Sequence, residues 1–195
     1  MGKRGAQAQN PEDSIKEYKE PSLLVQEIVT CKCTDWNPFL ELRNKALLSM
    51  LTMTGLRISE ILHLTTDQIF LDDPNDPGFL IIKNILVLKK RKKRILNEMG
   101  IKKDGVYKPL IDILTQYLEQ IKPGKLFNIS RWYAWQIIKN ITGKWPHYYR
   151  SQKMSNLVNT LKGAADATAA IMKVEARTVS HYYKSSWRDH KEELI

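Results

Sequence analysis

Apolar positions recur at helical spacing along the first part of the chain. The stretch SLLVQEIV has the pattern of a short amphipathic helix. After it, NPFLELRNKALLSMLTMTG predicts a longer helix that opens at Asn37-Pro38 and closes at Gly55, because proline suits the first turn of a helix and glycine suits its end. RISEILHL, which follows directly, predicts another short helix.

The middle of the chain has a β-type pattern. TTDQIFLDDPNDPG is rich in Asp and Pro and predicts turns. The β-branched run GFLIIKNILVL predicts a strand, and the basic run KKRKKR, a polar stretch NEMGIKKDG that we interpret as a turn, and VYKPL follow it. We therefore expect a small antiparallel sheet with a long basic hairpin.

Every later segment returns to the helical pattern. The predicted helices are LIDILTQYLEQI, SRWYAWQIIKNIT, YYRSQKMSNLVNTLKG, AADATAAIMKV and a last one around Tyr182. No internal repeat is present. Helices, a small sheet and further helices predict a mainly α-helical α+β domain over residues 21–195, preceded by a flexible polar leader over residues 1–20.

Charge narrows the class of partner. The 195 residues include 31 Lys and Arg against 21 Asp and Glu, a net charge of +10 that favours a polyanionic partner. No apolar run reaches the roughly 20 residues that span a bilayer, and no signal-peptide core is present, so we expect a soluble, intracellular, cytoplasmic protein. Cys31 and Cys33 supply too few ligands for a structural zinc ion and are expected to be reduced thiols.

Two short motifs combine residue types suited to binding phosphate. In TGLRISE, Gly55 lets the chain turn so that Arg57 begins the next element, and Glu60 can hold its guanidinium in a bidentate pair. In WPHYYR, proline begins a helix and places His147 and Arg150 on one side of its first turn. Each motif alone is also compatible with a structural role, an ion pair in the first case and a chance spacing in the second.

Two further stretches contain charged or reactive side chains, and their residue types alone do not decide the role of those side chains. The six consecutive cations of KKRKKR fit a solvated basic hairpin or one that contacts DNA. ARTVSHYYKSSW contains the adjacent tyrosines Tyr182 and Tyr183, which by themselves have the pattern of ordinary helix residues.

Taken in order, these motifs resemble the catalytic domain of the tyrosine recombinases, the phage-integrase and Xer-like family. The resemblance rests on RNKALL, on TGLR followed by Ser59-Glu60, on His147-x-x-Arg150 and on a tyrosine near the C-terminus, and it runs from about Pro21 to Tyr183. Members of the family usually carry a separate helical core-binding domain before the catalytic one, and no such domain is evident before residue 21.

The resemblance implies a mechanism. Arg57 and Arg150 would stabilise the charge on the phosphate, and a tyrosine hydroxyl would attack it to form a 3′-phosphotyrosyl link and release a 5′ hydroxyl. Because the bond energy is kept, no metal, cofactor or ATP is expected. His147 would assist proton transfer or hold the phosphate, and a hairpin lysine would protonate the leaving oxygen.

The family pattern also selects among rival residues. Lys173 stands nine residues before Tyr182, where the family has His or Trp, and Thr178 stands four before it. These spacings select Tyr182 as the nucleophile. Tyr183, its rival for that role, is then expected to be a packing residue. Alignment of VLKK with the family's strand selects Lys90 as the hairpin lysine, with four alternatives left open: Lys89, Lys92, Lys102 and Lys103.

The expected function is site-specific recombination for the integration or excision of a mobile element. The resemblance implies double-stranded DNA as partner, association with the nucleoid, and a tetramer on DNA that can be a monomer when free. Two alternatives stay open: a nicking and resealing enzyme like type IB topoisomerases, and a DNA-binding protein that keeps the fold without the chemistry.

Overall fold

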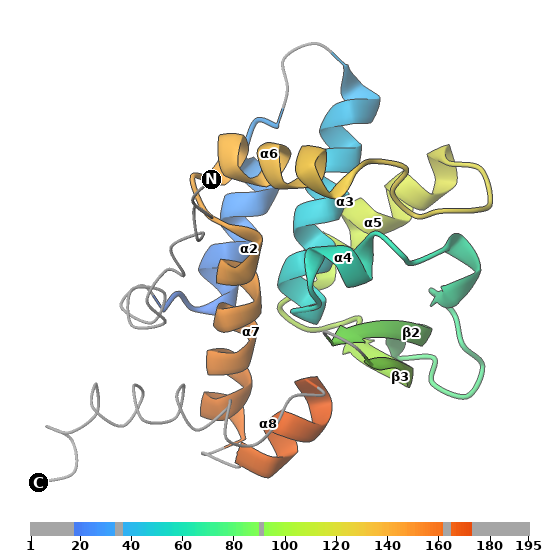
Figure 1. Ribbon diagram of the computed structural model, residues 1–195, viewed down its shortest axis with the longest axis vertical. Coiled ribbons are helices and arrows are strands. Elements are labelled where there is room, and N and C mark those ends of the chain that lie inside the picture. Colours follow the sequence, from blue (N-terminus) through green and yellow to red (C-terminus); the bar gives the residue numbers. More distant parts are fainter. Residues whose placement is uncertain (1–17, 34–36, 90–91, 162–164, 173–195) are drawn as a thin grey trace, which may run out of the picture.

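The computed structural model describes residues 18–33, 37–89, 92–161 and 165–172 (Figure 1). Helices dominate these ranges, and one small sheet lies beside them. The helices are α2 (Pro21–Thr30), α3 (Pro38–Thr54), α4 (Ile58–Ile61), the 3-10 turn η1 (Thr66–Gln68), α5 (Lys108–Gln120), α6 (Arg131–Thr142), α7 (Pro146–Thr160) and α8 (Ala165–Met172). The strands are β1 (Ile69–Phe70), β2 (Phe79–Lys89) and β3 (Lys92–Lys102). The architecture is the predicted mainly helical α+β class.

Helix α3 is the centre of the molecule. It contacts α2, α4, α5, α6, α7 and β3, and its side chains from Ala46 to Thr54 are all buried. The ends of α3 are those predicted from its sequence. The side chain of Asn37 accepts hydrogen bonds from the backbone amides of Phe39 and Leu40, and Gly55 ends the helix in the left-handed conformation with φ 63°.

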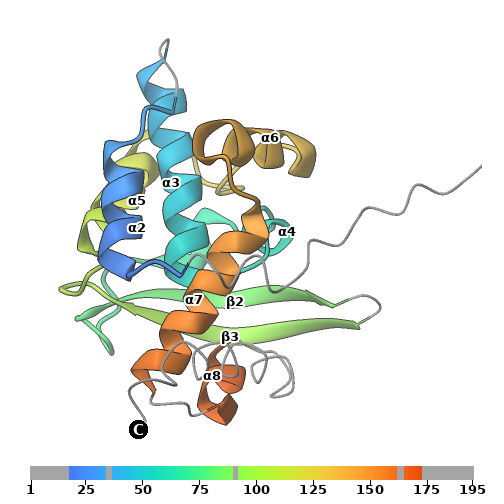
Figure 2. The ribbon, with the colours of Figure 1, turned by 90° about the vertical axis from the view of Figure 1, so that its left-hand side faces the viewer.

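The sheet has the antiparallel order β1-β2-β3, and its long hairpin runs beside the helices (Figure 2). Phe79 pairs with Lys102 at the base, and Lys89 pairs with Lys92 next to the turn. Ion pairs tie the base of the hairpin to the preceding loop, from Lys83 to Asp73 at 2.5 Å and from Lys103 to Asp72 at 2.7 Å. The hairpin is therefore anchored at one end, and its basic run lies at the other.

Two predictions for this region are wrong. Most of NEMGIKKDG, interpreted as a turn, belongs to β3, where Leu96 and Ile101 are buried against the core. TTDQIFLDDPNDPG, predicted as turns, contains the short strand β1. VYKPL leads directly into α5, which begins at Lys108 with a proline in its first turn. Pairing with the apolar β2 outweighs the polar composition of β3, since strand propensity depends on what lies opposite.

The predicted helices of the second half are confirmed where the structure describes them. Ser130 caps α6 through a hydrogen bond from the Tyr133 amide, and Gly143 ends it with φ 68°. Trp145 is extended and Pro146 starts α7, as proline at that position predicts. Near the α2–α3 connection, Cys31 and Cys33 are free thiols.

Replacing Gly55 with alanine should lower the stability of the protein more than the same replacement at Gly143. Both glycines have a positive φ, which costs alanine about 1 kcal/mol. At Gly55, however, a Cβ would also lie 2.8 Å from Met172 Cε and 2.9 Å from Lys153 Cβ, whereas nothing lies within 4 Å at Gly143. We expect Gly55→Ala to lower the free energy of unfolding by about 2–4 kcal/mol and Gly143→Ala by about 1 kcal/mol, measured by urea denaturation. Equal losses would contradict the close packing at Gly55.

Candidate active site

Arg57 stands where the chain leaves α3 and begins α4. It is the N-cap residue of α4, with an extended backbone at φ −68° and ψ 147°. Glu60, in the first turn of α4, accepts a hydrogen bond from Arg57 Nη1 through Oε1 at 2.8 Å and one from the Arg57 backbone amide through Oε2 at 2.7 Å. The predicted bidentate pair with the guanidinium is therefore wrong in detail. One carboxylate holds both the backbone and the side chain of Arg57.

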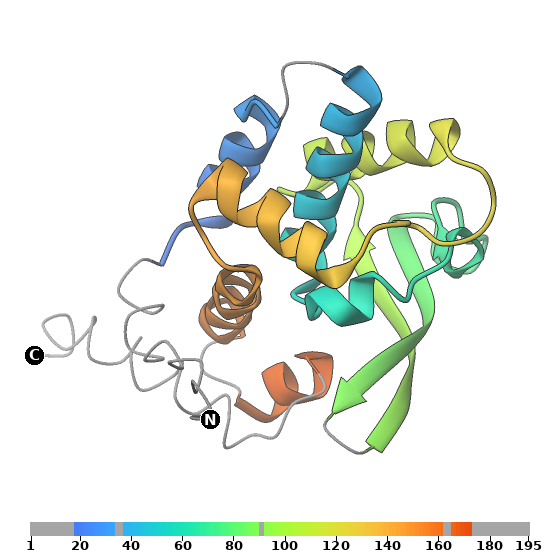
Figure 3. The same ribbon diagram turned by 45° about the horizontal axis from the view of Figure 1, so that its top comes forward.

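Arg150 reaches the same place from α7. Its Nη1 donates a hydrogen bond to the carbonyl of Gly55 at 2.7 Å, and its Nη2 donates one to the carbonyl of Met172 at 3.4 Å. The same Nη1 lies 4.0 Å from Glu60 Oε2. Figure 3 shows the elements that these contacts join, namely the end of α3, then α4, α7 and α8. Two arginines 93 positions apart in the sequence thus meet around one carboxylate.

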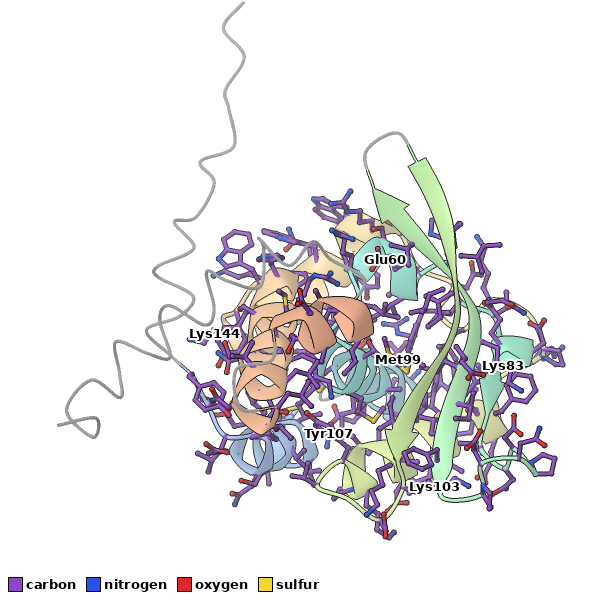
Figure 4. The ribbon with its side chains drawn as sticks, turned by 90° about the horizontal axis from the view of Figure 1, so that it is seen from below. Glu60, Lys83, Met99, Lys103, Tyr107 and Lys144 are labelled. Carbon is purple, nitrogen blue, oxygen red and sulfur yellow. The ribbon has the colours of Figure 1, made fainter. Side chains whose placement is uncertain are left out.

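The two guanidinium groups differ in their exposure. The side chain of Arg57 is 39% exposed, whereas those of Arg150 and Glu60 are 5% and 1% exposed. Glu60, on α4, balances one of the two positive charges and leaves the cluster with a net charge of +1 (Figure 4). Because Arg57 faces solvent, its guanidinium can bind an anion, and the buried Arg150 adds to the positive potential there.

His147 lies in the first turn of α7, three residues before Arg150, as the sequence predicts. Partial burial lowers the pKa of its imidazole, and the positive charges of Arg150 and Arg57 lower it further. His147 is nevertheless an exposed residue. The lowered pKa favours the uncharged imidazole, which can accept a proton or donate a hydrogen bond.

Aromatic packing fixes the start of α7. The rings of Trp135 and Trp145 have centroids 4.9 Å apart, and the ammonium of Lys139 lies 4.6 Å from the Trp145 ring. These contacts link the end of α6 to the residue that precedes Pro146. They hold the turn from which His147 and Arg150 project.

The hairpin lysines occupy different ends of the sheet. Lys102 pairs with Phe79 at the base of the hairpin and lies 3.4 Å from Asp104. The neighbouring Lys103 pairs with Asp72, far from Glu60 (Figure 4). Lys89 and Lys92 end β2 and begin β3, next to the turn. These positions disfavour Lys102 and Lys103 as partners of the arginine site.

The other predicted site residues fall outside the described ranges. They are Lys90, Lys173, Tyr182 and its rival Tyr183. Their roles stay predictions. Sequence reasoning also missed two acceptors of the site, the backbone carbonyls of Gly55 and Met172, since the type of a residue carries no information on where its carbonyl points.

The described ranges contain neither a candidate metal site nor a helix that could span a membrane. No group of three or more His, Cys, Asp or Glu side chains there is placed to hold a metal ion. The helices among those residues are all too short or too polar to cross a membrane.

Comparisons with known proteins give matches in structure alone. Neither known family profiles nor curated protein sequences match the chain. Three solved structures do match. XerH recombinase in a post-cleavage complex with a palindromic difH substrate matches with a TM-score of 0.68 and 15% sequence identity. XerA recombinase matches with a TM-score of 0.59 and 16% identity, and Tn1549 transposon integrase in complex with transposon right-end DNA with a TM-score of 0.53 and 14% identity.

These matches extend along nearly all of this chain. They cover 96%, 98% and 92% of it, respectively, but 55%, 66% and 67% of the three known chains. The chain thus spans between half and two thirds of their length. Its fold is that of the catalytic domain of tyrosine recombinases, the fold that its motifs predicted.

We expect the His147 imidazole to titrate below pH 6.5, the ordinary value, because partial burial and two arginines disfavour its charged form. The ring would be neutral at pH 7 and become charged only at lower pH. The midpoint can be measured by NMR of the imidazole Cε1–H, assigned by its loss in His147→Gln. Inorganic phosphate should raise the midpoint, since an anion beside the ring favours the charged form. A midpoint at or above 6.5 without phosphate would contradict the placement of His147.

Proposed function

We propose that the protein is a site-specific DNA recombinase that cuts and rejoins DNA through a 3′-phosphotyrosyl intermediate at Tyr182. The observation that carries the proposal is the meeting of Arg57, Arg150 and Glu60. Two guanidinium groups from distant elements share one buried carboxylate, and one of them faces solvent. The recombinase fold supports the same assignment.

Each described residue has a distinct part in the proposed chemistry. Arg57 binds a non-bridging oxygen of the scissile phosphate, where negative charge increases during attack. Arg150 adds positive potential from within the protein and fixes the ends of α3 and α8 beside the phosphate. Neutral His147 hydrogen bonds to the phosphate or takes the proton of the nucleophile.

The remaining steps belong to residues outside the described ranges. The hydroxyl of Tyr182 attacks phosphorus, the P–O bond to the 5′ oxygen breaks, and Lys90 supplies the proton to that oxygen. Lys173 hydrogen bonds to a phosphate oxygen. Rejoining is the reverse reaction, so the proposed cycle needs neither a metal ion nor ATP.

The proposed partner is double-stranded DNA. The net charge of +10 and the basic hairpin suit a phosphate backbone, and the XerH and Tn1549 structures are complexes with DNA. Because recombination joins two duplexes, we propose that four copies assemble on DNA. Integration or excision of a mobile element is the reaction for which such a chain is suited.

The nucleophile can be identified by trapping the covalent intermediate. A library of nicked duplexes with randomised sequence should yield protein–DNA adducts that survive SDS and form in the presence of a chelator. Peptide mapping should place the DNA on Tyr182. Tyr182→Phe should abolish the adduct, and the matched variant Tyr183→Phe should keep it.

Three outcomes would change the assignment. An adduct on Tyr183 would replace the nucleophile and keep the function. DNA binding without any adduct would favour a binding protein, and relaxation of supercoils without joining of two sites would favour a topoisomerase.

The two arginines should respond differently to replacement by lysine. Arg57→Lys keeps the charge and loses the planar fork, so the rate of adduct formation should fall about 100-fold, while the free energy of unfolding changes by less than about 1 kcal/mol. Arg150→Lys removes a buried donor to Gly55 or Met172, so it should lower both the rate and, by about 2 kcal/mol, the stability. Rates from adduct assays and stabilities from urea denaturation test this difference. Equal losses of stability would contradict the buried role of Arg150.

A further inference from the structure

A cavity lies next to the arginine site, and none of the described residues to which the proposed recombination chemistry assigns a part lines it. Its volume is about 480 Å³, and it is bounded by the end of α3, by β3, by α7 and by α8. Figure 4 shows one of its residues, Met99, on the hairpin. Six apolar side chains form most of the wall: Met53, Leu96, Met99, Ile101, Leu157 and Ile171.

One cationic side chain, Lys153, also lines this cavity. It lies on α7, one turn after Arg150, and its stem packs against Gly55, where an added Cβ would lie 2.9 Å from Lys153 Cβ. Its ammonium lies 4.5 Å from the centroid of the Tyr107 ring. In the part of the chain that the structure describes, no carboxylate lies within ion-pair distance of Nζ, although Glu98 belongs to the same cavity wall.

Two opposing effects act on the Lys153 amine, since the Tyr107 ring favours its charged form and burial favours its neutral form. Burial lowers the pKa of its side chain to about 8. Near pH 7.5 a lysine with such a pKa holds on the order of 100 times more free amine than an ordinary lysine. Desolvation is one of the ways in which proteins make a lysine nucleophilic.

We propose that Lys153 is an acylation site, at which the ε-amine takes an acyl group from an acyl thioester and the acyl chain lies in the cavity. The nitrogen lone pair attacks the thioester carbonyl carbon, an N–C bond forms, and the C–S bond breaks. The thiol leaves with the bonding electron pair and takes the proton that the nitrogen loses. Amine and thioester become amide and thiol, with no change of oxidation state.

The cavity suits the product of this reaction. An amide is uncharged and loses less than an ammonium does when apolar walls replace water. A cavity of about 150 Å³ can hold a benzene ring, so this larger cavity has room for a chain of several carbons. Leu157, one turn after Lys153 on α7, and Ile171 on α8 would contact such a chain.

The proposed acylation site also lies close to the arginine site. The stem of Lys153 and the guanidinium of Arg150 both contact Gly55, one against its backbone and the other at its carbonyl. The proposal does not depend on the DNA chemistry, and its test requires no DNA.

The test uses the full chain and two probes, acetyl-coenzyme A and octanoyl-coenzyme A, between pH 7.0 and 9.5. Peptide mass spectrometry follows acylation at Lys153 and at the exposed Lys122 as the reference. We expect acetylation at Lys153 to be at least about tenfold faster at pH 7.5, and its rate to level off above about pH 8, whereas the rate at an ordinary lysine rises until about pH 10. Equal rates, or a Lys153 rate that rises through pH 9.5, would overturn the proposal.

Two variants test the site and the cavity separately. Lys153→Arg keeps a cation and should lose the fast acylation of this segment. Leu157→Phe narrows the cavity and should slow octanoylation several-fold while changing acetylation less than about twofold. If Leu157→Phe, shown to be folded by urea denaturation, leaves octanoylation unchanged or slows both reactions equally, the acyl chain does not lie in the cavity.

Discussion

The close approach of α7 to the end of α3 at Gly55 organises the site. Gly55 ends α3 with a positive φ, its carbonyl accepts the hydrogen bond from Arg150, and its missing side chain leaves room for Lys153 and Met172. The conformation of one residue therefore connects three helices. It also directs the chain so that Arg57 begins α4 beside Arg150, which is why both guanidinium groups can share Glu60.

Glu60 gives the two arginines different roles. A buried carboxylate is costly unless it is paired, and here it accepts from the backbone and side chain of Arg57 and lies near Arg150. It fixes the position of Arg57 without enclosing it, so Arg57 keeps an exposed guanidinium while Arg150 stays inside. Positive charge that is fixed before an anion arrives needs little rearrangement to stabilise it, which is the property that phosphate chemistry requires.

Local signals in the sequence were sufficient for the helices that the structure describes. Asn37 and Pro38 at the start of α3, Gly55 at its end, and Ser130 and Gly143 around α6 act within one turn of the helix that they limit. The strands were harder to predict, because β3 is polar and owes its structure to β2 opposite. The site was predicted in part: the spacing of His147 and Arg150 is local to α7, whereas the contact of Arg150 with Gly55 joins residues 95 positions apart.

The sequence by itself determined the helix ends and the fold class, and it selected two arginines and a histidine as candidate site residues, since each of these depends on residue type at short spacing. Only the tertiary structure decided which donor each oxygen of Glu60 binds and which backbone carbonyls accept hydrogen bonds from Arg150. It also decided that Lys153 lines an apolar cavity. These facts depend on how α3, α4, α7 and α8 pack together. Hydrogen-bond geometry and burial are properties of that packing, and no single segment of sequence contains them.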